Sequence, residues 1–170
     1  MTMAIQLKPA PRNNMPIETY TEDKVAQNQV ADRSKSFLIS LSSGIEFGLE
    51  LKETRGVSSF GRIIPIPGTA RTIIGVTYFR GGIEAAVDLG ALWNMASLNL
   101  TKRSRAVLVE AEGRRAVLIV DSLVDLIDCD PGDLDLEKTN WLLTGQIGEI
   151  NKNERKIPLI SAALLLQSIA

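Results

Sequence analysis

The sequence has no histidine and a single cysteine, Cys129, among its 170 residues. Without imidazole there is no His-ligated metal, no Ser-His or Cys-His nucleophile pair and no histidine to accept a phosphoryl group. One thiol cannot close an internal disulfide or supply a sulfur-rich metal site, so we expect a reducing cytoplasm. No basic residue adjoins Cys129 in sequence, so we expect a structural thiol rather than a reactive one. These absences exclude many enzyme classes.

Charge of one sign and long apolar runs are also scarce. The 19 basic and 20 acidic residues leave a net charge of −1, which argues against nucleic acid as a partner. The longest apolar run, "PLISAALLLQSIA", is shorter than the roughly 20 residues that span a bilayer, so we expect no direct membrane insertion. The first 35 residues are polar, contain three prolines and lack a signal-peptide core. We expect a flexible tail over 1–35 and one folded domain over 36–170.

What the sequence does contain is a series of short apolar segments separated by turn residues. Phe47, Leu49 and Leu51 alternate with Gly48 and Glu50, which is typical of a half-buried strand. Similar segments predict strand pairs over 37–51, 73–89, 105–127 and 141–160, an extended segment at 63–68, and helical turns at 52–54, 89–95 and 161–170. About nine short strands predict small β-barrels rather than a parallel α/β sheet. The break between residues 96 and 105 predicts one lobe on either side.

Other chemical patterns favour structural roles. The acidic residues between Asp125 and Glu137 resemble a calcium-binding EF-hand loop only loosely, because Gly132 is misplaced and no Glu stands at the twelfth position. A solvated acidic loop is the better interpretation, so we expect neither a metal nor a cofactor. Trp93 and Trp141 are expected in the core or between the lobes, with an exposed anchoring role as the alternative.

Arg80 stands out because it interrupts two apolar runs in "TYFRGGIEAAV" and is followed by two glycines. A solvated hairpin turn is one interpretation. The other is a protein-binding site, since a planar guanidinium beside Tyr78, Phe79 and Ile83 combines hydrogen-bond donors with apolar surface. The residues alone leave both interpretations open.

Short motifs follow one another in a fixed order across residues 37–167. In chain order they are Phe37-Leu38, Pro67-Gly68, Gly75-Val76, Arg80-Gly81, Val87-Asp88-Leu89, Val120-Asp121, Val124 and Thr144-Gly145. No single motif is specific, but in their order over about 130 residues the chain resembles the CheW-like family, the adaptor proteins of bacterial chemotaxis arrays.

The resemblance implies a mainly β fold of two packed SH3-like five-stranded β-barrels with short helices. It also implies a cytoplasmic, non-enzymatic adaptor that couples the cytoplasmic helical hairpin of a chemoreceptor to the regulatory domain of a histidine kinase, at membrane-associated arrays. In this family the groove between the barrels accepts the receptor. The residues expected to bind a partner here are Thr54, Gly56, Tyr78, Phe79, Arg80 and Ile83.

The chain departs from the family pattern at five positions. Tyr78-Phe79 replaces Asn-Leu before the Arg-Gly pair, Ala85 replaces a proline, and Thr54 and Gly56 replace an aliphatic residue and an acid. These changes suggest a divergent member that serves a chemotaxis-like pathway for pilus-driven or light-directed movement.

Two other functions stay open at this point. A decoy would bind the kinase without the receptor. A hydrolase would use Asp88 and Asp121 as paired carboxylates that divide the acid and base roles.

Overall fold

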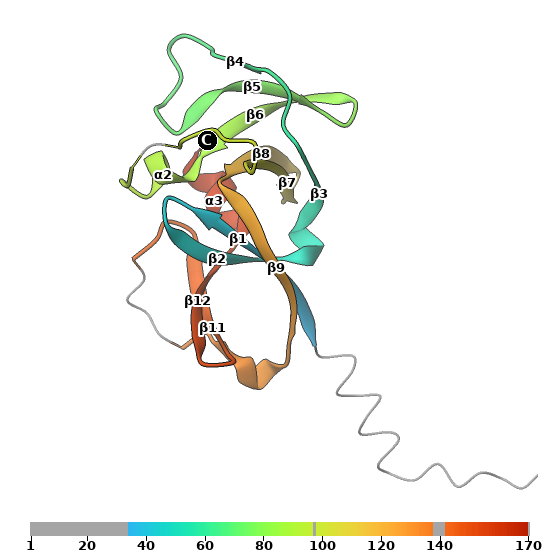
Figure 1. Cartoon of the computed structure of the whole chain (residues 1–170), viewed down its shortest axis with the longest axis vertical. Helices are drawn as coiled ribbons and strands as arrows, with labels where there is room; N and C mark the ends of the chain where they lie inside the picture. The colour runs from blue at the N-terminus through green and yellow to red at the C-terminus, as the bar shows by residue number, and fades with distance from the viewer. Residues whose placement is uncertain (1–33, 97, 138–141, 170) are drawn as a thin grey trace, which may run out of the picture. The chain divides into compact units, whose positions relative to one another are not determined.

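The computed structural model of the protein describes residues 34–96, 98–137 and 142–169 (Figure 1). The tail expected over 1–35 lies outside the described residues except for Ser34 and Lys35, and the first strand begins at Lys35. Trp141 also lies outside them.

The described residues form mainly strands, with short helical segments between them. The strands are β1 (Lys35–Ser42), β2 (Ile45–Glu50), β3 (Thr54–Ser58), β4 (Ile63–Ile64), β5 (Ile73–Phe79), β6 (Gly82–Asp88), β7 (Arg105–Ala111), β8 (Arg114–Val120), β9 (Ser122–Cys129), β10 (Leu134–Asp135), β11 (Gln146–Lys152) and β12 (Arg155–Ile160). The helical segments are η1 (Leu51–Glu53), α2 (Leu89–Leu92), η2 (Pro131–Asp133) and α3 (Ala162–Ser168).

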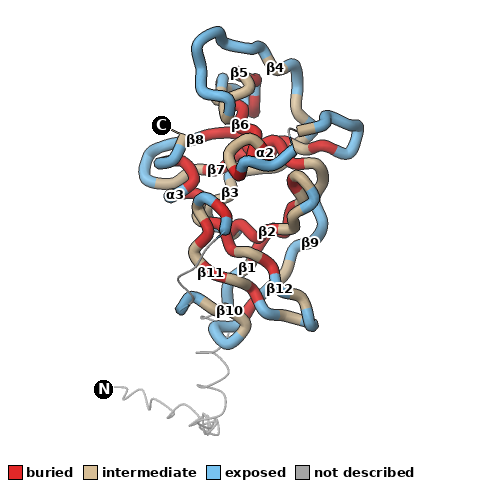
Figure 2. The backbone as a smooth tube through the Cα atoms, turned by 90° about the vertical axis from the view of Figure 1, so that its left-hand side faces the viewer, coloured by how far each residue is buried: buried red, intermediate tan, exposed pale blue. Residues whose placement is uncertain are grey.

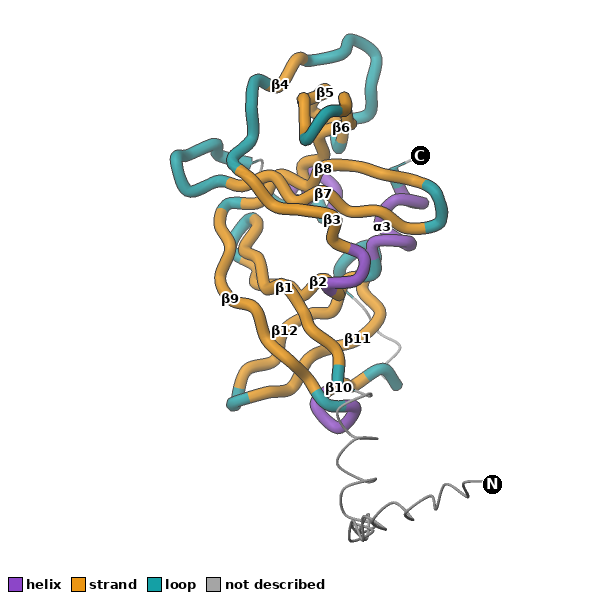
Figure 3. Tube along the Cα trace, turned by 90° about the vertical axis from the view of Figure 1, so that its right-hand side faces the viewer, coloured by secondary structure: helices purple, strands orange, loops and turns teal. Residues whose placement is uncertain are grey.

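These strands make two six-stranded sheets, which confirms the predicted mainly β fold with two lobes. Lobe A has the strand order β10-β11-β12-β2-β1-β9, and lobe B has the order β3-β7-β8-β6-β5-β4 (Figures 1 and 3). Each lobe therefore has the five strands that the resemblance implies, together with one two-residue strand at an edge, β10 or β4.

The predicted division of the lobes at residues 96–105 is wrong. The chain begins lobe A with β1 and β2, builds all of lobe B from β3 to β8, and returns to lobe A at Asp121. The return splits the apolar run that was expected as a single segment to Ile127. Hydrophobic periodicity reports burial but not which sheet a strand joins, and the parallel pairs β12–β2 and β6–β8 are long-range contacts.

Four tight hairpins carry the predicted turns. Their two-residue loops are Ser43-Gly44, Arg80-Gly81, Glu112-Gly113 and Asn153-Glu154, and both residues of each loop have positive φ. This is the type I′ geometry, whose twist matches that of the flanking strands. The glycines supply the left-handed conformation in three of the four turns, as their sequence positions predict.

Three apolar clusters hold the lobes together. One lies inside lobe A around Phe37, Ile39 and Ile150, and one inside lobe B around Phe79 and Ile119. The largest lies between the lobes, where it joins residues of β1, β2, β6, β7, β8, β12 and α3 (Figure 2). Along β8, Val117 and Ile119 face the core of lobe B, whereas their neighbours Leu118 and Val120 face lobe A. Strands buried on both faces explain the continuous apolar runs of the sequence.

Trp93 connects the lobes, as predicted for core or inter-lobe packing. Its ring is buried, packs edge-on against Phe47 at 5.3 Å between centroids, and donates its indole N–H to the carbonyl of Thr144 at 3.1 Å. Phe47 lies in β2 and Thr144 shortly precedes β11, both in lobe A, whereas Trp93 follows α2 in lobe B. The helix α3 closes the inter-lobe core and begins, as predicted, at the N-cap Ser161.

Candidate functional site

The turn between β5 and β6 places Arg80 at the end of lobe B. Arg80 and Gly81 have φ values of 43° and 92°, so both adopt the left-handed conformation that a type I′ turn requires. Asn, Asp and Gly are the residues that favour this conformation, and an arginine adopts it at a cost of about 1–3 kcal/mol. Turn propensity therefore does not explain the arginine.

The Arg80 guanidinium lies against β3 in the same lobe. A Cβ atom built on Gly56 would meet Nη1 of Arg80 at 2.7 Å and Cζ at 2.8 Å. The guanidinium carbon also lies 5.8 Å from the centroid of the Phe79 ring, within the range of a cation–π contact. Two of the residues that the family resemblance implies for partner binding, Gly56 and Arg80, are thus in contact.

Arg80 has no hydrogen-bond or ion-pair partner within the described part of the chain, and its side chain is exposed. Two other residues at the same position of a type I′ turn behave differently. Ser43 donates its hydroxyl to the carbonyl of Ala96 at 2.9 Å, and Glu112 accepts a bond from the amide of Gln167 at 3.0 Å. Those turn side chains are occupied within the protein, whereas the guanidinium of Arg80 is available to a partner.

Next to Arg80, the outer face of the hairpin carries two large exposed side chains. Tyr78 and Ile83 are directly opposite each other in the β5–β6 register and are 68% and 74% exposed. Their Cβ atoms lie about 5 Å apart in such a pair, so they form one apolar surface. We call Gly56, Tyr78, Arg80 and Ile83 the hairpin-tip patch.

The remaining two residues expected to bind a partner occupy different environments. Phe79 is 2% exposed and belongs to the core of lobe B, so its ring supports Arg80 from below and presents no free surface. Thr54 opens β3, two residues before Gly56, and is half-buried. Its hydroxyl has no hydrogen-bond partner among the described residues.

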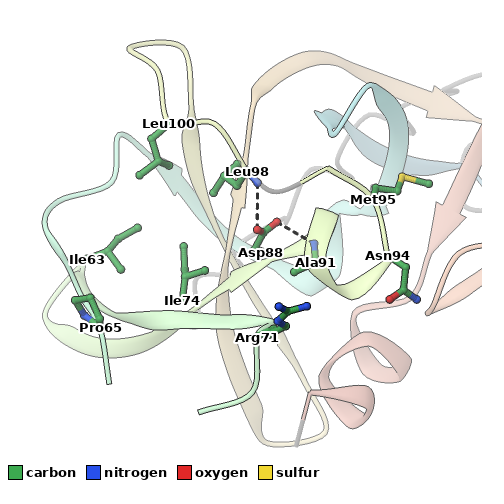
Figure 4. A pocket seen from close by; sticks show the side chains of 10 residues that line it. All are labelled: Ile63, Pro65, Arg71, Ile74, Asp88, Ala91, Asn94, Met95, Leu98 and Leu100. Atoms are coloured by element: carbon green, nitrogen blue, oxygen red, sulfur yellow. Dashed lines mark hydrogen bonds between the residues drawn. The ribbon is translucent and has the colours of Figure 1, made fainter. Parts of the chain in front are cut away.

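The far end of the same hairpin holds a hollow of about 780 Å³ (Figure 4). Aliphatic side chains of Ile63, Ile74 and Leu98 line it, together with Asp88 at the end of β6. Asp88 is 3% exposed, and its two oxygens accept the backbone N–H groups of Ala91 at 3.2 Å and Leu98 at 3.1 Å. The carboxylate thus caps α2 and fixes the loop that follows.

The structure does not support the paired carboxylates of a hydrolase. Asp121 lines a separate hollow of about 340 Å³, beside Ser43 and Ala96. Its Oδ2 accepts the backbone N–H of Ser43 at 2.8 Å, and its own N–H donates to Leu41. Asp88 and Asp121 therefore both serve the backbone and do not form one site.

The acidic loop between Asp125 and Glu137 forms an ion pair with a lysine of lobe A. Asp133 accepts the backbone N–H of Asp130 and lies 3.2 Å from the ammonium of Lys152, and these two contacts lower the pKa of its carboxyl. Within 34–96, 98–137 and 142–169, no three His, Cys, Asp or Glu side chains form a group that could hold a metal ion. The neighbouring Cys129 is 1% exposed, and burial raises the pKa of its thiol, which confirms a structural role.

Sequence reasoning missed a second exposed apolar region, on β9 at the edge of lobe A. Leu123, Val124 and Leu126 are 37%, 40% and 57% exposed, whereas the apolar run in which they lie was predicted only as part of a strand pair. Two backbone groups of this strand are already bonded to side chains, the N–H of Leu126 to Asp125 and the carbonyl of Asp128 to Lys152. Such bonds are one way in which edge strands avoid pairing with other chains.

Comparison with known proteins agrees with this architecture. The sequence profile of the CheW-like domain family matches residues 36–170. The crystal structure of the scaffolding protein TtCheW from Thermoanaerobacter tengcongensis superposes with a TM-score of 0.69 at 24% identity, over 74% of this chain and 88% of that one. No curated protein sequence matches the chain. No helix in the described residues is long and apolar enough to cross a membrane.

The chain belongs to the CheW-like domain family, which confirms the resemblance inferred from the ordered motifs. Members of this family are non-enzymatic scaffold proteins of chemotaxis signalling, and the structure shows this chain to have their fold. The general role of a chemotaxis scaffold follows from family membership.

Proposed function

We propose that the protein is a cytoplasmic adaptor that joins the helical hairpin of a chemoreceptor to the regulatory domain of a histidine kinase, at membrane-associated receptor arrays. The observation that carries this proposal is the hairpin-tip patch: an exposed guanidinium with no partner in the described residues, beside two exposed apolar side chains. Family membership supports the general role, and the patch supplies a surface for the receptor.

The physical argument rests on what arginine and apolar side chains do together at an interface. A guanidinium offers five N–H donors in a plane and binds carboxylate or carbonyl oxygens, often two at a time. Aromatic and aliphatic side chains beside it exclude water, which strengthens those bonds. An amphipathic helix meets both needs, because residues three and four apart lie on the same face.

Binding of the full chain to each partner separately tests the proposal. A soluble fragment of a chemoreceptor hairpin and the regulatory domain of a chemotaxis-type kinase, both from the same organism, are titrated by calorimetry. The adaptor role requires binding of both, and binding of neither at tens of micromolar contradicts it. Each contact is expected to be modest, because many weak contacts act together in an array.

The decoy is the second candidate, and the surroundings of Thr54 and Gly56 favour it. The family carries an aliphatic residue and an acid here, but in this chain the guanidinium of Arg80 occupies the space over Gly56. A partner helix must therefore meet a cation where other members present an anion. Binding of the kinase domain without the receptor fragment would identify the decoy.

A further inference from the structure

The contact between Gly56 and Arg80 joins two parts of lobe B that are not neighbours in the sheet. In the sheet order, β3 stands at one edge, and the β5–β6 hairpin lies on the other side of β7 and β8. Gly56 pairs with Leu108, whose side chain faces the core of lobe B, so a side chain at position 56 would point the same way. In place of that side chain, the guanidinium of Arg80 lies at the edge of the core.

The backbone of β3 gives no other reason for a glycine at this position. Gly56 does not have the positive φ that favours glycine, in contrast to Gly75 and Gly81. A glycine within a strand is less stable than alanine, because its backbone loses more freedom on folding. The missing Cβ would lie 2.7 Å from Nη1 of Arg80, so a side chain at position 56 would displace the guanidinium.

We propose that Gly56 is a positioning residue: it leaves space for the guanidinium of Arg80 to lie against β3, with its N–H donors available to a partner. This inference rests on the proposed function and specifies the partner's chemistry. The partner is a helix that presents an Asp or Glu carboxylate between apolar side chains, which pack on Tyr78 and Ile83. A guanidinium has hydrogen-bond donors and no acceptor, so it selects an anion. Because Arg80 is already held in place, less side-chain entropy is lost when the partner binds.

A stability cycle tests the positioning role without any partner. Gly56→Ala is expected to raise the melting temperature of the full chain less than it does in the Arg80→Ala background. In the wild-type protein the new methyl group displaces Arg80 from its contact with Phe79, whereas in Arg80→Ala the space is open and alanine is the better strand residue. Gly61→Ala is the matched control, because no atom lies within 4 Å of the Cβ it would add and its φ is not in the left-handed range.

A binding cycle tests the partner's chemistry. Against the chemoreceptor hairpin fragment, Gly56→Ala and Arg80→Ala are each expected to weaken binding about tenfold, and the double variant no further. Replacing the acidic residues at the tip of the fragment by Gln or Asn is expected to weaken binding to the wild-type protein but not to Arg80→Ala.

The outcomes separate this inference from the proposed function. An equal change of the melting temperature in both backgrounds overturns the positioning role, as do binding losses that multiply in the double variant. A receptor fragment that binds Gly56→Ala as tightly as the wild-type protein also overturns it. Failure of the wild-type protein to bind the fragment contradicts the adaptor and the carboxylate-bearing partner, whereas the stability cycle still decides whether Gly56 positions Arg80.

Discussion

The two ends of the β5–β6 hairpin carry charged residues of opposite sign in opposite circumstances. At one end Asp88 is 3% exposed, and both of its oxygens accept backbone N–H groups. At the other end Arg80 is exposed and has a cation–π contact but no ion pair or hydrogen bond in the described residues. Both belong to family motifs, so motif membership does not separate a structural residue from a functional one. The hydrogen-bond and ion-pair partners of the charged atoms make that distinction.

The largest effect is expected beside the Asp88 end, where Trp93 joins the lobes. Trp93→Ala removes a buried ring and its contact with Phe47, and should lower the free energy of unfolding by about 3–5 kcal/mol. Trp93→Phe keeps an aromatic ring but loses the bond to Thr144, and should cost less. Chemical denaturation of both variants measures the difference. Equal stability of Trp93→Ala and the wild-type protein would show that the inter-lobe core does not depend on this residue.

Asp88→Ala tests the structural end directly. It leaves the N–H groups of Ala91 and Leu98 without their acceptor in a buried place, and should destabilise the fold by about 2–4 kcal/mol. Ser161→Ala, which removes the half-buried cap of α3, is the matched control and should cost about 1 kcal/mol or less. A stable Asp88→Ala that loses binding instead would make Asp88 part of an interface.

Arg80→Ala tests the other end. We expect its affinity for the receptor fragment to fall by about 1–3 kcal/mol, while the melting temperature stays nearly unchanged. Arg71→Ala removes another exposed arginine, at the hollow beside Asp88, and should leave the affinity unaltered. A large loss of stability in Arg80→Ala would mean that the guanidinium serves the fold.

The smallest effect concerns Asp133 and Lys152, half-buried charges that, unlike Arg80, are paired with each other. The pKa of Asp133 is lowered from 3.8, so its contribution to stability is present above that pH and is lost as the pH falls through the lowered value. The pKa of Lys152 is raised from 10.5, so its contribution is lost as the pH rises through the raised value.

Thermal unfolding over the acidic range, compared with Asp133→Asn, measures the first of these losses. We expect the variant to show a weaker decline at low pH than the wild-type protein. Identical profiles would show that this pair, although formed, contributes nothing measurable to stability.

Local features of the fold were predictable from the sequence because their causes are local. Gly44, Gly81 and Gly113 mark three of the four type I′ turns, and Ser161 marks the start of α3. The fate of Phe79 was predictable in part. Adjacent strand residues point to opposite faces, so only one of Tyr78 and Phe79 could be exposed, although the sequence did not show which.

Other features depend on residues distant in the sequence and could not be read from it. The run from Val117 to Leu126 is mostly apolar, yet it passes from the core of lobe B, through the inter-lobe core, to the exposed edge of lobe A. In the sequence, an apolar residue looks the same in each of these three environments. Its exposure depends on which strands and helices cover it.

The sequence by itself determined the hairpins and the helix cap, because turn and capping residues act on a few neighbouring positions. It also determined membership of the CheW-like family, through the order of its short motifs. Only the tertiary structure decided which charges stay unpaired and where the guanidinium of Arg80 lies. That position depends on a space over Gly56 that no interaction within either strand creates. It exists because two strands from different parts of the chain close one end of the same lobe.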